Sequence, residues 1–319
     1  MKYCNIGGQA ILEGVMMKGP DSYAIAVRKP DNEIQVEKHK YKSYGEVHKL
    51  NNIPLVRGIV NFIESLYIGL KTLMDSAQYF EDEDDPKKTE AEKKKDKEEM
   101  DKLKEKSSEK GYLILTLVFS LVFAIGLFVL LPTLLSTILY KFTDNNFIVN
   151  FAEGILRLII FLVYVYVITV NKDIKRTYMY HGAEHKTINC MESGKDLTVE
   201  NVRAASRFHK RCGTSFVFLV MLISILLFMV INTDILWLRL LYRVVLIPIV
   251  GGITYEIIRY AGRHENAFAN ILSKPGLWLQ RLTTREPDDD MIEVAVKSVE
   301  AVIDWREYVK CVNNNSFEK

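Results

Sequence analysis

The sequence predicts a mainly α-helical, four-span membrane protein with a small α+β element on the cytoplasmic side. Two observations lead to this fold class: apolar runs of membrane-spanning length, and an uneven distribution of basic residues among the segments that connect them. The chain has 319 residues and a formal net charge of only +2, so no basic field indicates nucleic acid as a partner. The expected partner is the lipid bilayer.

Residues 1–80 are expected to form the cytoplasmic α+β element. Apolar residues alternate with other residues over 23–27 and over 34–36, which predicts two short strands around a Pro-Asp-Asn turn. From Pro54 onward, apolar residues recur at helical spacing and predict an amphipathic helix. We expect this helix to pack on the strands, and the alternative is a helix that lies in the membrane interface.

Residues 81–110 and 263–319 flank the predicted membrane domain. The first segment is a low-complexity mixture of Lys, Glu and Asp with almost nothing to bury, which indicates a solvated tether. The second is expected to be a cytoplasmic helical segment. Its last helix should open at Pro287, followed by an acidic first turn, and continue to about Trp305.

The membrane domain is expected over residues 111–262. A membrane-spanning helix needs roughly 20 apolar residues. The stretches that approach this length are 112–131, 150–170, 214–231 and 235–257. The first run continues past Pro132, so we expect a kink there or a short segment at the outer interface.

Basic residues in the connections predict the orientation. The loop 171–213 contains Lys172, Lys175, Arg176, Lys186, Lys195, Arg203, Arg207, Lys210 and Arg211, whereas the other two connections contain only Lys141. Cytoplasmic loops carry the excess of Lys and Arg, so this loop and both termini are predicted to lie in the cytoplasm. The N-terminus lacks the pattern of a cleavable signal peptide, so internal apolar segments are expected to direct insertion into the inner membrane.

The most suggestive chemistry lies in this loop, where His181, Glu184 and His185 stand in the order His-x-x-Glu-His. In a helix, the two histidines lie one turn apart on one face and can bind one metal ion. The same order occurs in inverted zinc peptidases, in which the glutamate is the general base. Gly182 weakens the helix, and the alternative is that these residues cap and solvate the end of the second span.

A second pair in the loop, His209 and Cys212, completes a ligand set that suits a divalent metal, zinc by ligand type. If the second span continued straight to His181, that residue would lie about 9 Å deeper in the cytoplasm than His209, at 1.5 Å rise per residue. A shared site therefore predicts a break in the segment 171–181. The alternative is membrane anchoring by the basic residues, with a buried thiol.

Three further groups of residues stand out in the sequence. Glu13 lies in the glycine-rich segment 7–20 and is either a third carboxylate ligand or a surface carboxylate. The segment lacks the lysine of a nucleotide-binding P-loop. Its glycines are therefore expected to permit close approach of the backbone to other parts of the protein. The four cysteines should be reduced thiols without disulfides.

Charged residues inside the second and fourth spans are expected to snorkel to the outer interface. The alternative is that they pair across the spans around a polar cavity. These residues are Glu153, Arg157, Arg239 and Arg243.

With these residues in view, the chain resembles the YqhQ-like family of bacterial membrane proteins. The matching segments are GGQAILEGVMM at 7–17, HGAEHK at 181–186, HKRCGT at 209–214 and PGLWLQ at 275–280. The resemblance covers nearly the whole chain and implies a bacterial inner-membrane protein. The family is often labelled a predicted metal-dependent enzyme, but that label names no substrate.

Two functions follow from these patterns. The first is a metal-dependent hydrolase at the cytoplasmic face, in which His181, His185, His209 and Cys212 hold the metal and Glu184 accepts a proton from water. The second is a non-enzymatic accessory factor for membrane-protein biogenesis or translocation that docks on a larger membrane complex. In that case the metal site is structural or does not exist, so the sequence leaves open whether the protein is an enzyme.

Overall fold

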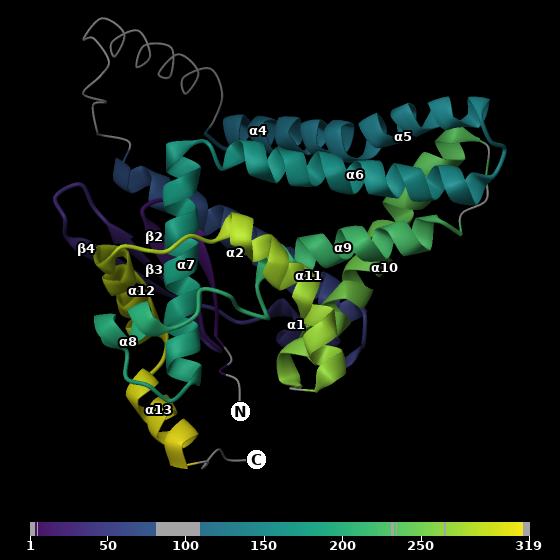
Figure 1. Ribbon diagram of the computed structural model, residues 1–319. Helices are drawn as coiled ribbons and strands as arrows, with labels where there is room; N and C mark the ends of the chain where they lie inside the picture. Colours follow the sequence, from purple (N-terminus) through teal and green to yellow (C-terminus); the bar gives the residue numbers. More distant parts are fainter. Residues whose placement is uncertain are drawn as a thin grey trace, which may run out of the picture.

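The computed structural model describes residues 4, 6–80, 109–230, 233, 235–264 and 266–314; the side chains of 109–114, 117 and 236 are not described. Over these residues the chain is mainly helical, with one four-stranded sheet (Figure 1). The strands are β1 Gly7–Ile11, β2 Gly14–Lys18, β3 Ser22–Arg28 and β4 Ile34–Lys40. The helices are α1 Tyr44–Val47, α2 Val56–Ala77, α4 Glu109–Ile125, α5 Leu131–Ser136, α6 Asn146–Ile168, α7 Lys172–Glu192, α8 Val199–Ala204, α9 Gly213–Phe228, α10 Leu236–Arg263, α11 Ala267–Thr283, α12 Asp289–Val302 and α13 Trp305–Asn314. Most of the predicted tether, residues 81–108, lies outside the described part.

The sheet is antiparallel, with its strands paired in sequence order. The predicted strand pair is confirmed as β3 and β4, and Asn32 takes the positive φ of 67° that their turn requires. The sequence analysis did not predict β1 and β2. Side chains of both faces of β2 are buried, including Val15, Met16 and Met17, so the strand shows no alternation of apolar and polar residues.

The sheet is covered on both faces, which produces a three-layer unit. Ile25 and Val27 of β3 pack with Ile68 of α2 on one face. On the other face, the sheet shares a hydrophobic core with α7 and α12 that includes Met17, Tyr180 and Met291. Segments from the N-terminal, central and C-terminal parts of the chain therefore form one packed unit (Figure 1).

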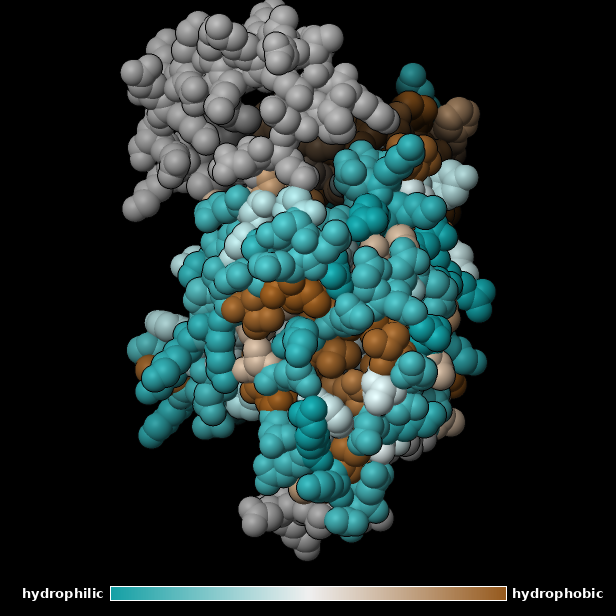
Figure 2. Space-filling view, turned by 90° about the vertical axis from the view of Figure 1, so that its left-hand side faces the viewer, coloured by the Kyte–Doolittle hydropathy of each residue, from teal (hydrophilic) through white to brown (hydrophobic). Residues whose placement is uncertain are grey.

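The predicted C-terminal helix is present but shorter than expected. It begins after Asp288 as α12 and ends at Val302, and Trp305 starts a separate helix, α13. Figure 2 shows the side of the molecule that contains the sheet. The surface coloured by hydropathy on this side is mostly hydrophilic. A water-exposed position for this unit is consistent with that surface.

Among the described residues, three stretches are long and apolar enough to cross a membrane: Val118–Lys141, Asn146–Ile168 and Trp237–Arg263. The expected third span, 214–231, is the 16-residue helix α9. At 1.5 Å per residue α9 is about 24 Å long, short of a typical hydrocarbon core of roughly 30 Å. A count of four spans is therefore not established by helix length. In the first span, a π-helical turn at Gly126–Leu130 directly precedes Pro132, which is the irregularity expected before a proline.

Helix α2 packs on the sheet through Ile68, as expected, but most of its large apolar side chains are exposed. The residues that it buries are mainly small, including Gly58 and Gly69, and the helix packs against α10. A Cβ atom at Gly58 would lie 2.8 Å from the Tyr255 side chain, so glycine permits this close approach. Large apolar side chains point outward instead; they are Phe62, Ile63, Leu66, Tyr67, Leu70, Leu73 and Met74. This exposed face is the one that the interfacial alternative requires.

The charged residues inside the spans are buried in the protein, so the expected snorkelling is wrong. Glu153 of α6 forms ion pairs with Arg157 on its own helix and with Arg243 of α10. Their side chains are at most 8% exposed even without lipid around them. Pairing across the second and fourth predicted spans, the alternative reading, is confirmed.

Candidate metal centre

Helix α7 carries the first two candidate ligands. An interruption between α6 and α7 determines where α7 lies. Helix α6 ends at Ile168, and Asn171 caps α7 by accepting hydrogen bonds from the backbone N–H groups of Asp173 and Ile174. The two helices run in different directions (Figure 1). The predicted break therefore exists, but it lies at residues 169–171, at the beginning of the expected segment. Beyond the break α7 is a continuous helix.

His181, His185 and Cys212 form a group whose potential ligand atoms all lie within 4.8 Å of one another. The two imidazole rings are one helical turn apart, with ring centroids separated by 4.4 Å. Cys212 is the N-cap residue of α9, and its Sγ lies 3.2 Å from Nε2 of His181. Two nitrogen ligands and one sulfur ligand at this spacing could hold a metal ion.

Backbone carbonyls orient both histidines. Nδ1 of His181 lies 2.8 Å from the carbonyl oxygen of Thr283, and Nδ1 of His185 lies 2.7 Å from that of Arg207. A carbonyl can only accept, so each Nδ1 carries the proton and donates it. When a ring is neutral, as metal binding requires, its Nε2 lone pair is directed toward Cys212. Metal-binding histidines are held in the same way, with the second ring nitrogen hydrogen-bonded to a carbonyl or carboxylate.

The electrostatics favour a thiolate in this group. Burial opposes ionisation of Cys212, but the nearby His181 and His185 outweigh it and hold the pKa of the thiol well below its usual value. Burial also opposes a charge on His185, but Cys212 and Glu184 raise the pKa of this imidazole to about 9. Without a metal ion, the group therefore holds a thiolate beside an imidazolium. A thiolate is the form in which cysteine binds metals.

Gly182, between the two histidines, has a packing role. A Cβ atom at this position would lie 1.9 Å from the carbonyl oxygen of Arg285, in the segment that follows α11. The backbone N–H of Arg285 also donates to the carbonyl of Tyr178 at 2.9 Å. Glycine thus lets this segment lie directly on α7, where the adjacent Thr283 orients His181. The expected weakening of the helix is outweighed by this tertiary contact.

Glu184 is buried beside the group. Its Oε2 lies 3.4 Å from Nε2 of His185. A Cβ atom at Gly8 of β1 would lie 2.5 Å from Cγ of Glu184, so the glycine-rich strand packs directly against this side chain. The predicted role of Gly8, close backbone approach, is confirmed. The sheet thereby fixes the carboxylate next to a ligand atom.

His209 is not a member of the group of three, although the sequence analysis included it among the ligands. Its ring centroid lies 5.6 Å from that of His185, but its Nε2 faces Glu192 at 3.7 Å. Gln280 of α11 fixes the backbone of His209 by accepting from its N–H and donating to its carbonyl oxygen. Burial opposes a charge on Glu192, yet its hydrogen bond with His209 and the charge of Arg211 lower its pKa. His209 is thus paired with a carboxylate.

Glu13, the other predicted candidate ligand, and His264, a further histidine, both lie outside the group. Glu13 forms an ion pair with Arg176 and accepts a hydrogen bond from the Tyr180 hydroxyl, so its carboxylate is not directed at the group. His264 is exposed, and its Nδ1 lies 2.9 Å from the carbonyl oxygen of Tyr260.

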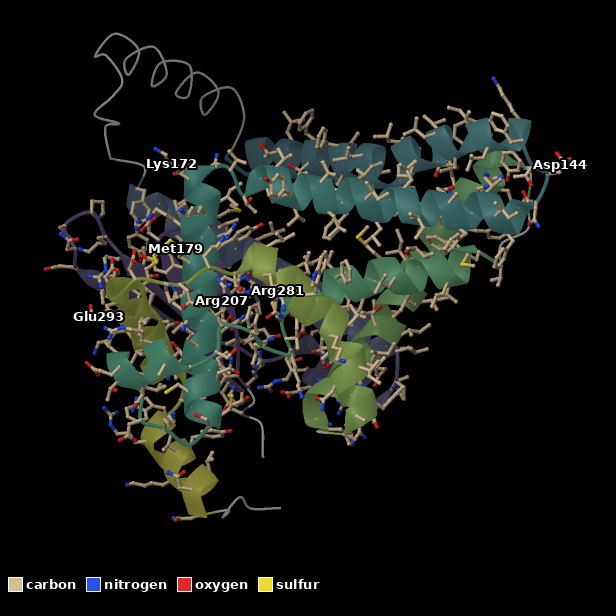
Figure 3. The ribbon with its side chains drawn as sticks, viewed as in Figure 1. Asp144, Lys172, Met179, Arg207, Arg281 and Glu293 are labelled. Carbon is tan, nitrogen blue, oxygen red and sulfur yellow. The ribbon has the colours of Figure 1, made fainter. Side chains whose placement is uncertain are left out.

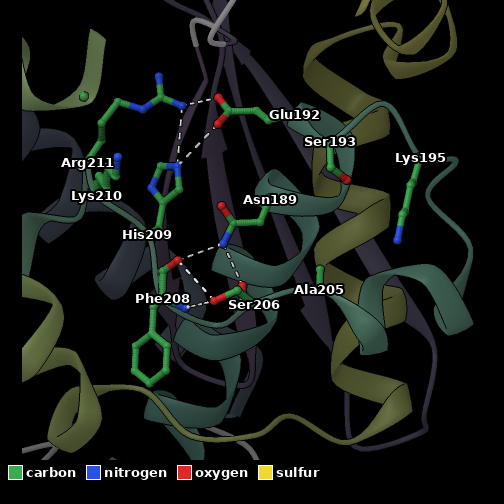
Figure 4. A pocket seen from close by; sticks show the side chains of 11 residues that line it. Asn189, Glu192, Ser193, Lys195, Ala205, Ser206, Phe208, His209, Lys210 and Arg211 are labelled. Carbon is green, nitrogen blue, oxygen red and sulfur yellow. Dashed lines mark hydrogen bonds and ion pairs between the residues drawn. The ribbon is translucent and has the colours of Figure 1, made fainter. Parts of the chain in front are cut away.

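A cavity of about 430 Å³ lies next to the group (Figure 4). Its lining residues are Asn189, Glu192, Ser193, Lys195, Ala205, Ser206, Phe208, His209, Lys210, Arg211 and Gly262. His209 is part of this lining, and its ring is also the neighbour of His185. Sequence reasoning did not identify the cavity, because its walls come from α7, the segment after α8 and α10. Basic side chains in the lining suit a ligand with a negative charge.

Comparison with known proteins assigns a family but no activity. Residues 53–305 match the family described as "Protein of unknown function (DUF1385)". The "Uncharacterized protein YqhQ" of Bacillus subtilis (strain 168) is 37% identical over 298 residues, which cover 92% of this chain and 90% of the relative. No solved structure matches the chain.

Proposed function

The chain belongs to the DUF1385 family of proteins of unknown function, and from its own site we propose that it is a multi-pass membrane protein that acts as a metal-dependent hydrolase. The observation that carries this proposal is the convergence of His181, His185 and Cys212, with both histidines oriented by carbonyls. The buried carboxylate of Glu184 lies beside them.

The packed unit supports four crossings with both termini in the cytoplasm. Along the chain, the sheet comes before α4, α7 comes after α6, and α12 comes after α10. The sheet, α7 and α12 nevertheless contribute to one hydrophobic core. A single core must lie on one side of the membrane. The chain therefore crosses an even number of times between α7 and α12. Helix α10 provides one crossing, so α9 has to provide the other despite its length. The excess of Lys and Arg in the loop 171–213 supports a cytoplasmic position for this side.

Cysteine labelling tests this orientation. Cys4, Cys190 and Cys212 are buried, so a variant that lacks only Cys311 is a suitable background. We expect a cysteine at exposed Asn145 to react with a membrane-impermeant thiol reagent in whole cells. Cysteines at exposed Asp31 and Lys195 should react only after the membrane is permeabilised. Labelling of Asp31→Cys or Lys195→Cys in intact cells would contradict the orientation.

The donor set fits a divalent ion, and zinc suits two imidazoles and one thiolate. Three protein ligands are the number used by catalytic zinc sites, whereas structural sites usually have four. A bound ion would supply a Lewis acid that lowers the pKa of a water molecule. Glu184 would be the proton acceptor for such a water, since its Oε2 lies 3.4 Å from Nε2 of His185. The basic lining of the cavity behind His209 favours a substrate with an anionic group, such as a phosphoester.

One observation favours a second function, that of a non-enzymatic accessory factor. The apolar outward face of α2 can dock a partner helix in a membrane complex as well as lipid. A metal at the site would then only tie α7 to the start of α9. The variant Glu184→Gln separates the two functions, because it removes a proton acceptor and leaves the three metal ligands unchanged.

A further inference from the structure

A second candidate site lies where α5, α6 and α10 meet. It is at the end of these helices that is far from the sheet and close to Asp144 (Figure 3). Glu153 lies at its centre. The carboxylate accepts from Arg157 at 2.9 Å, from Arg243 at 2.6 Å, and from the hydroxyls of Thr133 and Ser136 at 3.0 and 3.1 Å. Four donors satisfy an ionised carboxylate, so Glu153 has no capacity for a further cation.

Arg239 is a third guanidinium in the same cluster and has no carboxylate partner among the described residues. Its Nη2 donates to the hydroxyl of Tyr140 and to the carbonyl oxygen of Thr233, both of which are neutral. Only 2% of Arg239 and 3% of Arg243 is exposed. In the described part of the chain, the cluster thus combines three guanidinium groups with one carboxylate.

Several guanidinium nitrogens of this cluster are buried without a hydrogen-bond acceptor. They are Nε of Arg157, Nε and Nη1 of Arg239, and Nε of Arg243. The ring of Phe228 lies 5.5 Å from the guanidinium carbon of Arg157 and 5.8 Å from that of Arg243. Such cation–π contacts contribute less than the burial of an uncompensated ion costs. Aromatic rings therefore do not compensate for the excess positive charge.

We propose that this cluster binds a phosphate group, with Arg239, whose Nε and Nη1 have no acceptor, as its principal donor. The planar guanidinium fork matches phosphate oxygens, and the charge of the anion would compensate for the excess cations. The phosphate belongs either to an anionic phospholipid or to free inorganic phosphate. This site is separate from the metal centre, and the proposal does not depend on the proposed hydrolase.

Phosphorus analysis of the purified full-length protein tests the proposal directly. The protein is purified in phosphate-free buffer with an uncharged detergent, and chloroform extraction separates lipid phosphorus from inorganic phosphate. We expect about one phosphate group per chain, and the solvent phase that contains it identifies the source. If the phosphate is lipid, phosphatidylglycerol should raise the thermal midpoint more than phosphatidylcholine does. If it is inorganic, sodium phosphate should raise the midpoint more than sodium chloride does at equal ionic strength.

Arg239→Gln should weaken the binding of that probe by at least about tenfold, because a hydrogen bond to a charged group contributes roughly 1.5 to 3 kcal/mol. Arg281→Gln, at an exposed arginine outside the cluster, is the matched control and should bind as the unmodified protein does. If Arg239→Gln does not fold, Arg239→Lys keeps the charge but loses the planar fork, and it should also bind more weakly. Phosphorus-free protein whose midpoint responds to neither probe, or equal binding by the Arg239 and Arg281 variants, would overturn the proposal.

Discussion

His185→Ala is expected to abolish metal binding and, with it, the response of the protein to a chelator. Its Nε2 is one of three ligand atoms, and the remaining His181 and Cys212 cannot hold a divalent ion tightly on their own. In the unmodified protein, a metal present at a hundredfold excess over its dissociation constant stabilises the fold by about 2.7 kcal/mol. For a chain of 319 residues, chelation should then lower the thermal midpoint by about 4 °C.

Loss of packing alone would also destabilise a variant at this buried position, so the chelator response is the decisive comparison. The midpoint of His185→Ala should be the same with and without chelator. The control is His264→Ala, which removes an exposed histidine outside the group and should keep the full response. A chelator-sensitive His185→Ala protein would show that the metal is bound elsewhere.

Glu184→Gln is expected to eliminate activity while leaving metal content and the thermal midpoint nearly unchanged. Glutamine keeps the size of the side chain against Gly8 and can still hydrogen-bond, but it cannot accept a proton. Removing a general base typically lowers the rate by about 10² to 10⁴-fold. The measurement is complementation of a deletion strain, with protein abundance and metal content determined in the same cells.

The matched control is Glu293→Gln, which changes an exposed glutamate of α12 that forms an ion pair with Arg28. It should complement fully. If Glu184→Gln also complements fully and retains the metal, the site is structural and the accessory-factor function becomes the better account. A loss of metal together with activity would instead indicate that Glu184 is itself a ligand.

Local patterns predicted those parts of the fold in which one face of an element differs from the other. The alternation at Tyr23, Ile25 and Val27 identified β3, since these side chains face α2 and their neighbours face α12. Strand β2 was missed because both of its faces are buried. The outward apolar face of α2 was predicted only as the alternative to packing on the strands, because a hydrophobic period gives the width of an apolar stripe but not the surface that it contacts.

The candidate site was predictable where it depends on spacing along one helix, as for His181 and His185. The estimated 9 Å offset from the second pair assumed a straight helix, but the break at residues 169–171 removes that assumption. Long-range contacts decided the rest. Only the tertiary structure shows that Gln280 and Glu192 hold His209, and that Gly182 accommodates the carbonyl of Arg285.

X-ray absorption spectroscopy of the metal in the purified protein tests the central claim most directly, because it counts sulfur and imidazole ligands around the ion. We expect close to one divalent ion per chain, with one sulfur and two imidazole ligands from the group of three. Cys212→Ser should lose the sulfur contribution, whereas Cys190→Ser, at another buried cysteine, should retain it. Metal-free protein, or a spectrum without sulfur that Cys212→Ser leaves unchanged, would contradict the metal centre.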